Sequence, residues 1–370
     1  MRILLTTDTV GGVWDHTATL AHELSGGGHE VLVAMVGEPT AGSLAALPDG
    51  VQSVSRAYKL EWMPDSGADV DAAGRWLRAL ADAWEADVVH LNQMCYAAAG
   101  FAAPTVTAVH SDVLSWFREV KGHDAPPDDW AGYARRVRAG LHASDAVVAP
   151  SRYQALLTER HYGRRVDHVI HNGLPYSAEP PASGDARTVV LTAGRAWDEA
   201  KGVRVLDDAL ALLGADAPDA HLLGETAAPG RGEIALRHLQ GHGRQARAEV
   251  DDWMRRAALY VAPSLYEPFG LAPLEAALSG CALVLSEIGS LRELWDGCAA
   301  FFPRGDAAAL AETLRGLSGD PAERARLAGA ARTRALRRYA APWMCASYTA
   351  LYGTLVDTRT GRRARSIVAA

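Results

Sequence analysis

The sequence predicts an α/β protein made of two Rossmann-like domains in succession. Short β-rich runs alternate with helical stretches in both halves of the chain, which is the pattern of a parallel sheet covered by helices. A Pro-rich stretch at residues 175–184 interrupts the alternation, which then restarts. With 370 residues, the chain is long for one ordinary domain and comfortable for two. Because ligands favour the carboxyl ends of parallel strands, we expect the two domains to face each other across a deep cleft.

Before residue 175, each predicted strand is a short β-rich run, and each predicted helix carries apolar residues three or four positions apart. The strands are expected at residues 3–6, 31–36, 88–91, 106–109, 146–149 and 169–171. The helices between them are expected at residues 17–24, 72–84 and 130–141.

After the Pro-rich stretch the same alternation returns. Strands are expected at residues 189–193, 221–224, 259–262, 282–285 and 299–302. Helices are expected at residues 203–213, 246–257, 271–278 and 307–317, and two more at residues 321–338 and 343–355.

Composition argues against several classes of function. The formal net charge is -7 with a pI near 6.0, whereas nucleic-acid binders usually carry a basic surplus, so nucleic acid is not an expected partner. Hydrophobic residues at 49% and charged residues at 22% are typical of a globular protein. The four cysteines are scattered, which favours neither a disulfide framework nor a zinc site. With no targeting pattern and no apolar run near the ~20 residues of a spanning helix, we expect a cytoplasmic protein without a transmembrane segment.

The first candidate site is the run at residues 8–14, which follows the first predicted strand and opens a helix. Gly11 and Gly12 let the backbone approach a ligand closely, and the amino terminus of a helix offers unpaired N–H groups to an anion. The run lacks the G-x-G-x-x-G spacing of a dinucleotide fingerprint. Two interpretations therefore stay open at this point: an anion-binding loop, and a tight turn without a ligand.

The second candidate site combines Gly194 and Arg195 with Lys201, after the first strand of the second half. Two cations six residues apart, flanked by glycines and leading into a helix, suit a pyrophosphate. Their fixed positive charge would offset the negative charge on a departing nucleoside diphosphate. Of 37 basic residues only three are lysines, which favours a function for Lys201 over a solvated charge pair.

The third candidate site is the segment at residues 264–275, which follows a strand and starts a helix. Glu267 lies in the loop and Glu275 about one turn into the helix, so both carboxylates can face one cleft and accept the hydroxyls of vicinal diols. The helix start could hold a phosphate or sugar oxygen with the amides of Phe269, Gly270 and Leu271. The alternative is a capped helix with Glu275 on a solvated face. The concentration of proline, glycine and glutamate in this one segment favours a binding site.

Together these motifs resemble retaining glycosyltransferase family 4, which has the GT-B fold. The E-x7-E signature of that family stands at Glu267 and Glu275, with the linking Pro-Phe-Gly-Leu intact. Its Gly-Gly loop, its Asn-Gly before the interdomain linker and its Gly-Arg…Lys-Gly element stand at residues 11–12, 172–173 and 194–202. The resemblance spans nearly the whole chain, and four motifs in order are far more specific than any one of them.

The resemblance implies a role for each matched residue. Glu275 would hold the ribose hydroxyls, and Glu267 the hydroxyls of the donor sugar. Arg195 and Lys201 would bind the diphosphate, and Gly12 would approach it from the other domain.

Further residues are matched less directly. His110 follows the strand at residues 106–109 and matches the histidine that the family places beside the donor sugar, whereas by itself it reads as a hydrogen-bonded strand-end histidine. Gly11, Asn172 and Gly194 would belong to the donor site with their motifs, and His242 stands where the family places the loop near the nucleobase. Residues 226–232 replace the usual family pattern, which leaves the base contacts and the donor open.

The resemblance also divides the chain by substrate. Residues 1–174 with the C-terminal helix 342–370 would form the acceptor-binding domain, and residues 175–341 the nucleotide-sugar donor-binding domain. The acceptor is expected near Trp14, Asp15, Trp116 and Lys121, although residues 111–130 also fit an ordinary surface loop. The arginines from residue 359 onward suit either a peripheral membrane contact or a solvated tail.

The expected reaction moves a sugar from a UDP- or GDP-sugar to a hydroxyl of a small molecule, glycan or lipid, with retention of the anomeric configuration. No cofactor and no essential metal are expected, because no Asp-x-Asp motif follows a suitable strand and Asp251 and Asp252 fall within a predicted helix. A GT-B sugar-nucleotide epimerase and a catalytically silent sugar-nucleotide-binding protein are the alternatives. A nicotinamide dehydrogenase is disfavoured by the missing G-x-G-x-x-G and by the glutamate pair.

Overall fold

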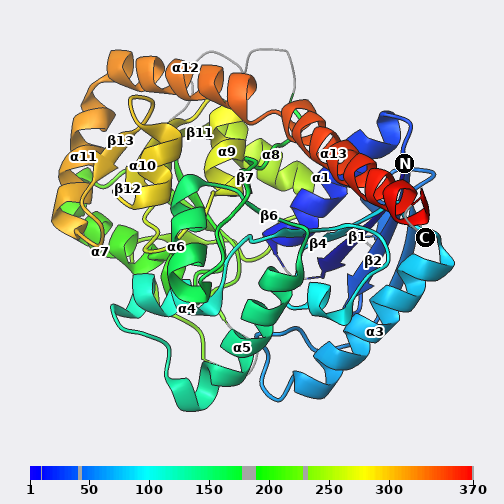
Figure 1. Cartoon of the computed structure of the whole chain (residues 1–370). Coiled ribbons are helices and arrows are strands. Elements are labelled where there is room, and N and C mark those ends of the chain that lie inside the picture. The colour runs from blue at the N-terminus through cyan, green and yellow to red at the C-terminus, as the bar shows by residue number, and fades with distance from the viewer. Residues whose placement is uncertain (10, 41–43, 177–188, 228–231, 369–370) are drawn as a thin grey trace. The chain divides into compact units, whose positions relative to one another are not determined.

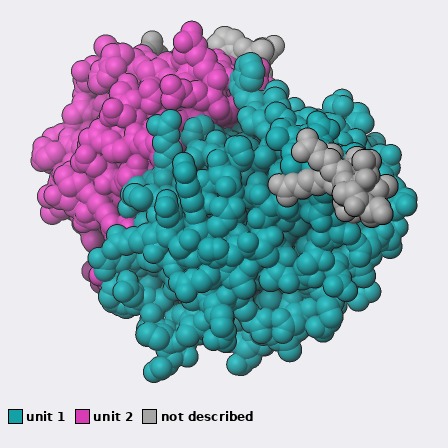
Figure 2. Space-filling view, in the orientation of Figure 1, with its two compact units in different colours: residues 1–118, 123–175, 341–370 teal, residues 119–122, 176–340 magenta. Residues whose placement is uncertain are grey.

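The structure, a computed structural model, describes residues 1–9, 11–40, 44–176, 189–227 and 232–368, with side chains up to residue 360. The chain divides into two compact units (Figure 2). Unit 1 comprises Met1–Arg118, His123–Pro175 and Ala341–Ala370, and unit 2 comprises Glu119–Gly122 and Tyr176–Ala340. Most of the predicted linker at residues 175–184, part of the replaced pattern at residues 226–232, and the tail arginines beyond residue 360 lie outside this description.

Unit 1 is built on a seven-stranded sheet whose strands all run parallel, in the order β3-β2-β1-β4-β5-β6-β7. Its strands are β1 (Arg2–Asp8), β2 (Glu30–Val36), β3 (Gln52–Arg56), β4 (Val88–Leu91), β5 (Thr105–Ala108), β6 (Ala146–Ala149) and β7 (His168–Val169). Its helices are α1 (Gly12–Gly26), α3 (Gly67–Ala83), α4 (Val113–Trp116), α5 (Pro127–Ala143), α6 (Arg152–Tyr162) and α13 (Ala341–Val368) (Figure 1).

Both faces of this sheet are covered, as β1 shows. Ile3 and Leu5 point into one core together with α1, whereas Leu4 points into a second core together with α3. The strand therefore reads as a continuous apolar run instead of an alternating one, which is the signature of a parallel sheet buried on both sides.

Helix α13 runs for 28 residues and packs beside α1, as Figure 1 shows in red and blue. Its residues Met344, Tyr348 and Leu351 join the core that contains Ile3 and Leu5. The spacing of three to four residues between them is the apolar stripe of a helix that packs on one face. Among all helices in the described ranges, none combines the length and the apolar character that crossing a bilayer requires.

Unit 2 repeats the architecture with a six-stranded parallel sheet in the order β10-β9-β8-β11-β12-β13. Its strands are β8 (Val189–Ala193), β9 (Ala220–Leu223), β10 (Gln240–Gly241), β11 (Ala257–Ala262), β12 (Ala282–Ser286) and β13 (Ala300–Phe302). Its helices are α7 (Val203–Leu213), α8 (Arg247–Arg256), α9 (Leu271–Leu278), α10 (Gly289–Trp295), α11 (Ala307–Gly319) and α12 (Pro321–Arg338). These two parallel sheets with interleaved helices confirm the predicted α/β fold with two Rossmann-like domains.

Several elements were not predicted from the sequence. All five residues of β3 are exposed at an edge of the sheet, so no apolar run marks this strand. Helix α6 buries Gln154 and Thr158 beside Leu157 and Tyr162, so polar residues interrupt its apolar spacing. Helix α10 has only seven residues, which is too short for a periodic pattern.

Residues 119–122 group with unit 2, whereas the sequence-based division placed them in the N-terminal domain. Two ion pairs join these residues to the rest of unit 2. The Lys121 ammonium lies 2.6 Å from Glu199, and the Arg304 guanidinium lies 3.4 Å from Glu119. Lys121 is therefore already engaged by a carboxylate in this structure, on a side chain that remains about one third exposed.

Candidate active site

The segment between β11 and α9 carries the predicted donor-binding residues and is fixed by backbone hydrogen bonds. The amides of Leu265 and Tyr266 both donate to the carbonyl of Ala200, at 2.8 and 3.3 Å. The hydroxyl of Ser290, at the start of α10, donates to the carbonyl of Glu267. The loop therefore connects to two other elements of unit 2, and the position of Glu267 does not depend on the loop alone.

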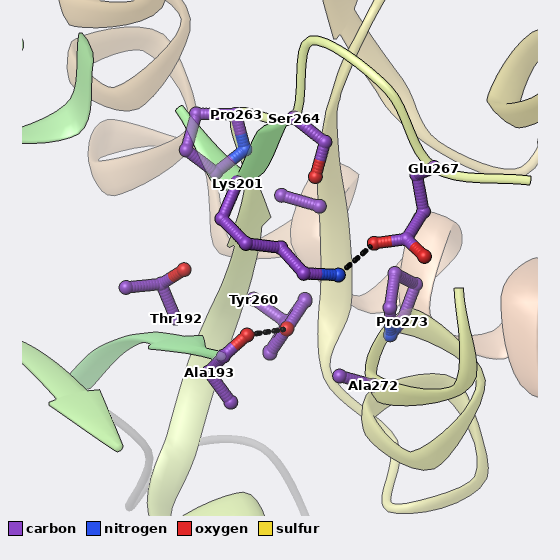
Figure 3. Close-up of a pocket in the computed structure, with 10 residues that line it drawn as sticks. Thr192, Ala193, Lys201, Tyr260, Pro263, Ser264, Glu267, Ala272 and Pro273 are labelled. Atoms are coloured by element: carbon purple, nitrogen blue, oxygen red, sulfur yellow. Dashed lines mark hydrogen bonds and ion pairs between the residues drawn. The ribbon is translucent and has the colours of Figure 1, made fainter. Parts of the chain in front are cut away.

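Lys201 ends a short 3-10 helix, Glu199–Lys201, in which the side chain of Asp198 accepts a hydrogen bond from the amide of Ala200. Its ammonium lies 2.6 Å from Oε2 of Glu267, as the dashed line in Figure 3 shows. Both side chains are largely buried, with 26% and 14% of their surfaces exposed. The structure thus brings together one predicted cation and one predicted carboxylate into a charge-assisted pair.

This pair lines a cavity at the carboxyl ends of β8 and β11 (Figure 3). Ala193 ends β8, Pro263 and Ser264 follow β11, and Pro273 comes from the first turn of α9. The buried hydroxyl of Tyr260 donates to the carbonyl of Ala193 at 3.4 Å, and burial raises the pKa of this phenol far above its ordinary value. Tyr260 is therefore a neutral donor in the wall of the cavity.

Gly202 brings the cation close to the loop. Its φ is 61°, and a Cβ built there would lie 2.0 Å from the carbonyl oxygen of Pro263. No other residue fits between the start of α7 and the strand end that leads to Glu267. The Gly after the lysine is therefore required by the close approach of two backbones.

Glu275 lies in the second turn of α9, as predicted. It pairs with an arginine that the sequence analysis did not identify. The guanidinium of Arg247, at the start of α8, contacts Oε1 of Glu275 and also lies 2.8 Å from Asp251. The carboxylate of Glu275 is 19% exposed, whereas the Arg247 side chain is 68% exposed. The exposed guanidinium of Arg247 therefore covers part of the Glu275 carboxylate.

The amino end of α9 is shaped by the residues before it. Phe269 is buried and packs edge-on against Tyr339, with ring centroids 5.4 Å apart. Gly270 has φ of 89° and leads into Leu271, the first residue of the helix. Phe269 thus anchors the turn through its side chain, which leaves only its backbone for a ligand.

Within the described part of the chain, no hydrogen bond joins Arg195 to Lys201 or to Glu267. Its guanidinium lies 3.3 Å from Asp198 and over the ring of Trp197 at 5.2 Å, and 42% of the side chain is exposed. Gly194 does lie beside the lysine, since a Cβ added to it would be 3.5 Å from the Lys201 side chain. Each predicted cation therefore holds a carboxylate of its own, Asp198 for Arg195 and Glu267 for Lys201.

His242 belongs to an aromatic cluster beside β9 and α8. Its Nε2 lies 2.9 Å from Nδ1 of His221, and its ring lies 4.6 Å from that of Trp253. Arg256 covers Trp253 at 4.1 Å. Burial lowers the pKa of His242, and His221 lowers it further, so the ring is neutral near pH 7 and offers a flat surface.

In unit 1 the predicted residues separate into exposed and buried ones. Gly11 and Gly12 begin α1 and are exposed, as is Asp15. The indole of Trp14 is 9% exposed and packs in the core of unit 1, and its contact with an acceptor stays a prediction. Trp116 ends α4 half-buried, edge-on to the ring of Phe117.

His110 lies two residues beyond β5, at the edge of a buried polar cluster that the sequence did not reveal. Its Nε2 lies 2.7 Å from Oδ1 of Asn92, and its ring lies 4.6 Å from that of His16. Burial lowers the pKa of His110 to about 4 and that of His90, nearby in β4, to about 3. All of these imidazoles are neutral at pH 7. Asn172 is buried in the same unit.

No motif pointed to Asn92, His16 or Arg247. Asn92 is a single polar residue after a strand, and Arg247 is one arginine among many. One feature of the sequence could have pointed to His16. It lies four residues before Leu20, on the buried face of α1, where a histidine is unusual. Their partners come from distant parts of the chain, so only the folded structure reveals them.

Comparison with known proteins decides the family. The family model for glycosyltransferase family 4 matches residues 10–177, and that for glycosyl transferases group 1 matches residues 187–320. Glycogen synthase of Mycobacterium tuberculosis is 30% identical over 389 aligned positions, which cover 90% of this chain and 90% of that protein. Phosphatidyl-myo-inositol mannosyltransferase of Mycolicibacterium smegmatis is 31% identical over 86% of this chain and 84% of its own.

The chain belongs to glycosyltransferase family 4. It is therefore a glycosyltransferase that uses a nucleotide sugar, as the motifs predicted. Solved structures agree on the GT-B fold. Sucrose-phosphate synthase of Thermosynechococcus elongatus matches with a TM-score of 0.79 at 19% identity over 97% of this chain and all of that one. Anabaena HepE, solved with UDP-glucose, matches with a TM-score of 0.72 at 18% identity, over 96% of this chain and all of its own.

Proposed function

We propose that this family 4 glycosyltransferase transfers a sugar from a UDP- or GDP-sugar to an acceptor hydroxyl of a small molecule, glycan or lipid, with retention of the anomeric configuration. The observation that carries the proposal is the Lys201–Glu267 pair, 2.6 Å apart at the carboxyl ends of two parallel strands. A nucleotide sugar needs a cation for its diphosphate and, beside it, a carboxylate that accepts hydrogen bonds from the sugar hydroxyls.

The donor would be held by unit 2. Glu275 takes the ribose hydroxyls, displacing Arg247, and Glu267 takes hydroxyls of the sugar. Lys201 then exchanges its contact with Glu267 for the diphosphate. Arg195, with 42% of its side chain exposed, reaches the same group from its partner Asp198.

Catalysis in this proposal is mainly electrostatic. As the bond to the anomeric carbon breaks, both electrons of that bond go to the departing diphosphate, whose charge Lys201 and Arg195 stabilise. The acceptor hydroxyl attacks the same face and gives its proton to the departing phosphate oxygen, which accounts for retention. Glu267 and Glu275 are occupied by hydroxyls in this arrangement, so neither serves as the nucleophile.

The relatives suggest which donors to test first. Anabaena HepE has been solved with UDP and with UDP-glucose, and the names of the curated relatives describe a glycogen synthase and a phosphatidyl-myo-inositol mannosyltransferase. The acceptors in these names differ widely. We therefore propose UDP-glucose as the first donor and leave the acceptor defined by its hydroxyl alone. The neutral aromatic surface formed by His242 and Trp253 supports the proposal that the loop at His242 binds the nucleobase of the donor.

We also propose that transfer needs neither a metal nor a cofactor, because Lys201 and Arg195 supply the positive charge that a metal would otherwise provide. Dialysis against EDTA should leave the rate of transfer unchanged. A cytoplasmic location is part of the same proposal, and the four free cysteines support it, since thiols persist in a reducing compartment.

The test is a panel of UDP-, GDP-, ADP- and dTDP-glucose in thermal-shift measurements, followed by transfer assays with the donor that binds. We expect UDP- or GDP-glucose to raise the melting temperature and the product to keep the anomeric configuration by NMR. An inverted product would contradict the proposed mechanism. Conversion of the donor into an epimer without any acceptor would contradict the proposed reaction.

A further inference from the structure

The side-chain amide of Asn92 is held in one orientation by two acceptors. Asn92 directly follows β4 and is 8% exposed. Its Nδ2 donates to the carbonyl of Thr6 at 2.7 Å and to Oγ1 of Thr17 at 3.0 Å. The Thr17 hydroxyl donates its own proton to the carbonyl of Val13 at 2.8 Å, so towards Asn92 it can only accept.

This orientation fixes what Asn92 offers to His110. Turning the amide over would place Oδ1 at 2.7 Å from the carbonyl oxygen of Thr6, and two acceptors cannot form a hydrogen bond. Oδ1 therefore faces Nε2 of His110, 2.7 Å away, and it can only accept. Nε2 of His110 must carry the proton of that hydrogen bond.

The second ring nitrogen follows from the charge of the ring. Because burial lowers the pKa of His110 to about 4, the imidazole carries one proton near pH 7, and Nε2 has it. Nδ1 is then a bare lone pair. Among the described residues, none donates a hydrogen bond to it, and the residue keeps part of its surface exposed. A neutral histidine locked in one tautomer presents an acceptor of fixed direction.

We propose that Asn92 is a positioning residue that locks His110 as the Nε2-protonated tautomer, so that Nδ1 accepts a hydrogen bond from a hydroxyl of the sugar substrate. The hydroxyl part rests on the proposed function, and the tautomer does not. A lone pair accepts from a hydroxyl but repels a carboxylate or phosphate oxygen. The arrangement therefore selects a neutral sugar with a free hydroxyl at this position over a uronate.

The tautomer is measured on the unmodified protein. Nitrogen-15 NMR of histidine-labelled enzyme at pH 7.5, with His110 assigned by comparison with His110→Gln, distinguishes a protonated from an unprotonated ring nitrogen. We expect a proton on Nε2 alone. A proton on Nδ1, or two tautomers in exchange, would overturn the inference. This measurement needs no substrate and no turnover.

Two variants separate positioning from a structural role. Asn92→Leu removes the acceptor, so both tautomers should appear and kcat/KM should fall by about tenfold, the effect of one lost buried hydrogen bond. Thr17→Val removes one of the two acceptors of the Asn92 amide but leaves Thr6 to orient it, so the Nε2-protonated form and most of the activity should remain. Retention of full kcat/KM by Asn92→Leu, or loss of the tautomer in Thr17→Val, would contradict the proposal.

Gln93 provides the matched control. It is the next residue, equally buried, and its amide oxygen accepts from Thr6 at 2.7 Å without contacting His110. Gln93→Leu therefore removes a buried amide of the same kind. We expect the tautomer of His110 to be unchanged and kcat/KM to stay within about twofold. If Gln93→Leu behaved like Asn92→Leu, packing and not the hydrogen bond would be responsible.

Contact with a sugar hydroxyl is tested by adding UDP-glucose, with UDP as the reference and calorimetry to establish that each binds. A hydrogen bond to an unprotonated imidazole nitrogen shifts its nitrogen-15 resonance upfield. We expect this shift with UDP-glucose and not with UDP. Binding of UDP-glucose without the shift would overturn the hydroxyl contact, whereas absence of binding would instead count against the donor named under the proposed function.

Discussion

The ammonium of Lys201 lies 2.6 Å from Oε2 of Glu267, although the two residues are 66 positions apart in the sequence. One backbone relationship produces this contact: the amides of Leu265 and Tyr266 donate to the carbonyl of Ala200, next to the lysine. Backbone hydrogen bonds thus join the loop with the carboxylate to the turn with the cation. In the proposed mechanism, a diphosphate would draw Lys201 away and leave Glu267 to accept sugar hydroxyls.

The first prediction concerns this charge pair. Lys201→Met keeps most of the side-chain volume but removes the cation, so kcat/KM for transfer should fall at least 100-fold, which corresponds to about 2.7 kcal/mol of lost transition-state stabilisation. The measurement is steady-state kinetics with the donor that binds. Lys59→Met, which removes an exposed lysine of unit 1, is the control and should leave kcat/KM within about twofold. Equal activity of the two variants would remove Lys201 from the mechanism.

The second prediction separates Glu275 from its partner Arg247. Glu275→Gln keeps the shape but weakens the acceptor for ribose hydroxyls, so the affinity for UDP should fall by about tenfold. Arg247→Met should change that affinity less than about threefold, because an ion pair with a side chain 68% exposed contributes little. Isothermal titration calorimetry with UDP measures both. A larger loss in Arg247→Met would show that the arginine itself binds the nucleotide.

The third prediction compares two glycines in the left-handed conformation, Gly202 before α7 and Gly163 after α6. Gly202→Ala places a Cβ 2.0 Å from the carbonyl oxygen of Pro263 and should lower the free energy of unfolding by more than 3 kcal/mol, roughly the upper range for single substitutions. Gly163 has φ of 65° and ψ of 19°, close to the 61° and 21° of Gly202, but open space around it. Gly163→Ala should therefore lower the free energy of unfolding by only about 1 kcal/mol, the left-handed strain alone. Urea unfolding measures both, and equal losses would mean that backbone strain, and not the close approach, determines the requirement.

The fourth prediction is a pH dependence of stability. Burial holds the pKa of His16 well below its ordinary value of 6.5, and the neighbouring His110 and His90 lower it further. Below pH 6.5 the unfolded chain therefore binds a proton that the folded protein does not, and the free energy of unfolding falls as the pH is lowered. His16→Leu should weaken this fall by about 1.4 kcal/mol per pH unit between pH 6 and 5.

Urea unfolding from pH 5 to 8 tests this, with His22→Leu as the control on the same helix. His22 is exposed and solvated in both states, so its replacement should leave the pH dependence unchanged. Glu61 acts in the opposite direction, because burial raises its pKa to about 7 and stability is lost as the pH rises through that range. Its contribution is the same in both variants and cancels in the comparison. An unchanged slope in His16→Leu would contradict the prediction.

Sequence patterns predicted those helices and strands that are determined by the spacing of their own apolar residues. Helix α7 was predicted with its observed bounds because Leu206, Leu210 and Leu213 repeat at helical spacing. Edge strand β3 was missed because no buried face constrains its residues. The burial of Trp14 was not predicted for a related reason: an indole near a glycine loop suits a binding site as well as a core, and its burial depends on the packing of α1.

The sequence alone established the fold class, the family and the residue types at the proposed donor site, because Glu267, Glu275 and Lys201 stand with their glycines in short motifs whose spacing is local. Only the tertiary structure decided the pairs: Lys201 with Glu267, Glu275 with Arg247, and Asn92 between Thr6 and His110. Hydrogen bonds of this kind join residues brought together by the parallel sheets. Their directions, and with them the tautomer of His110, depend on geometry that spacing along the chain does not contain.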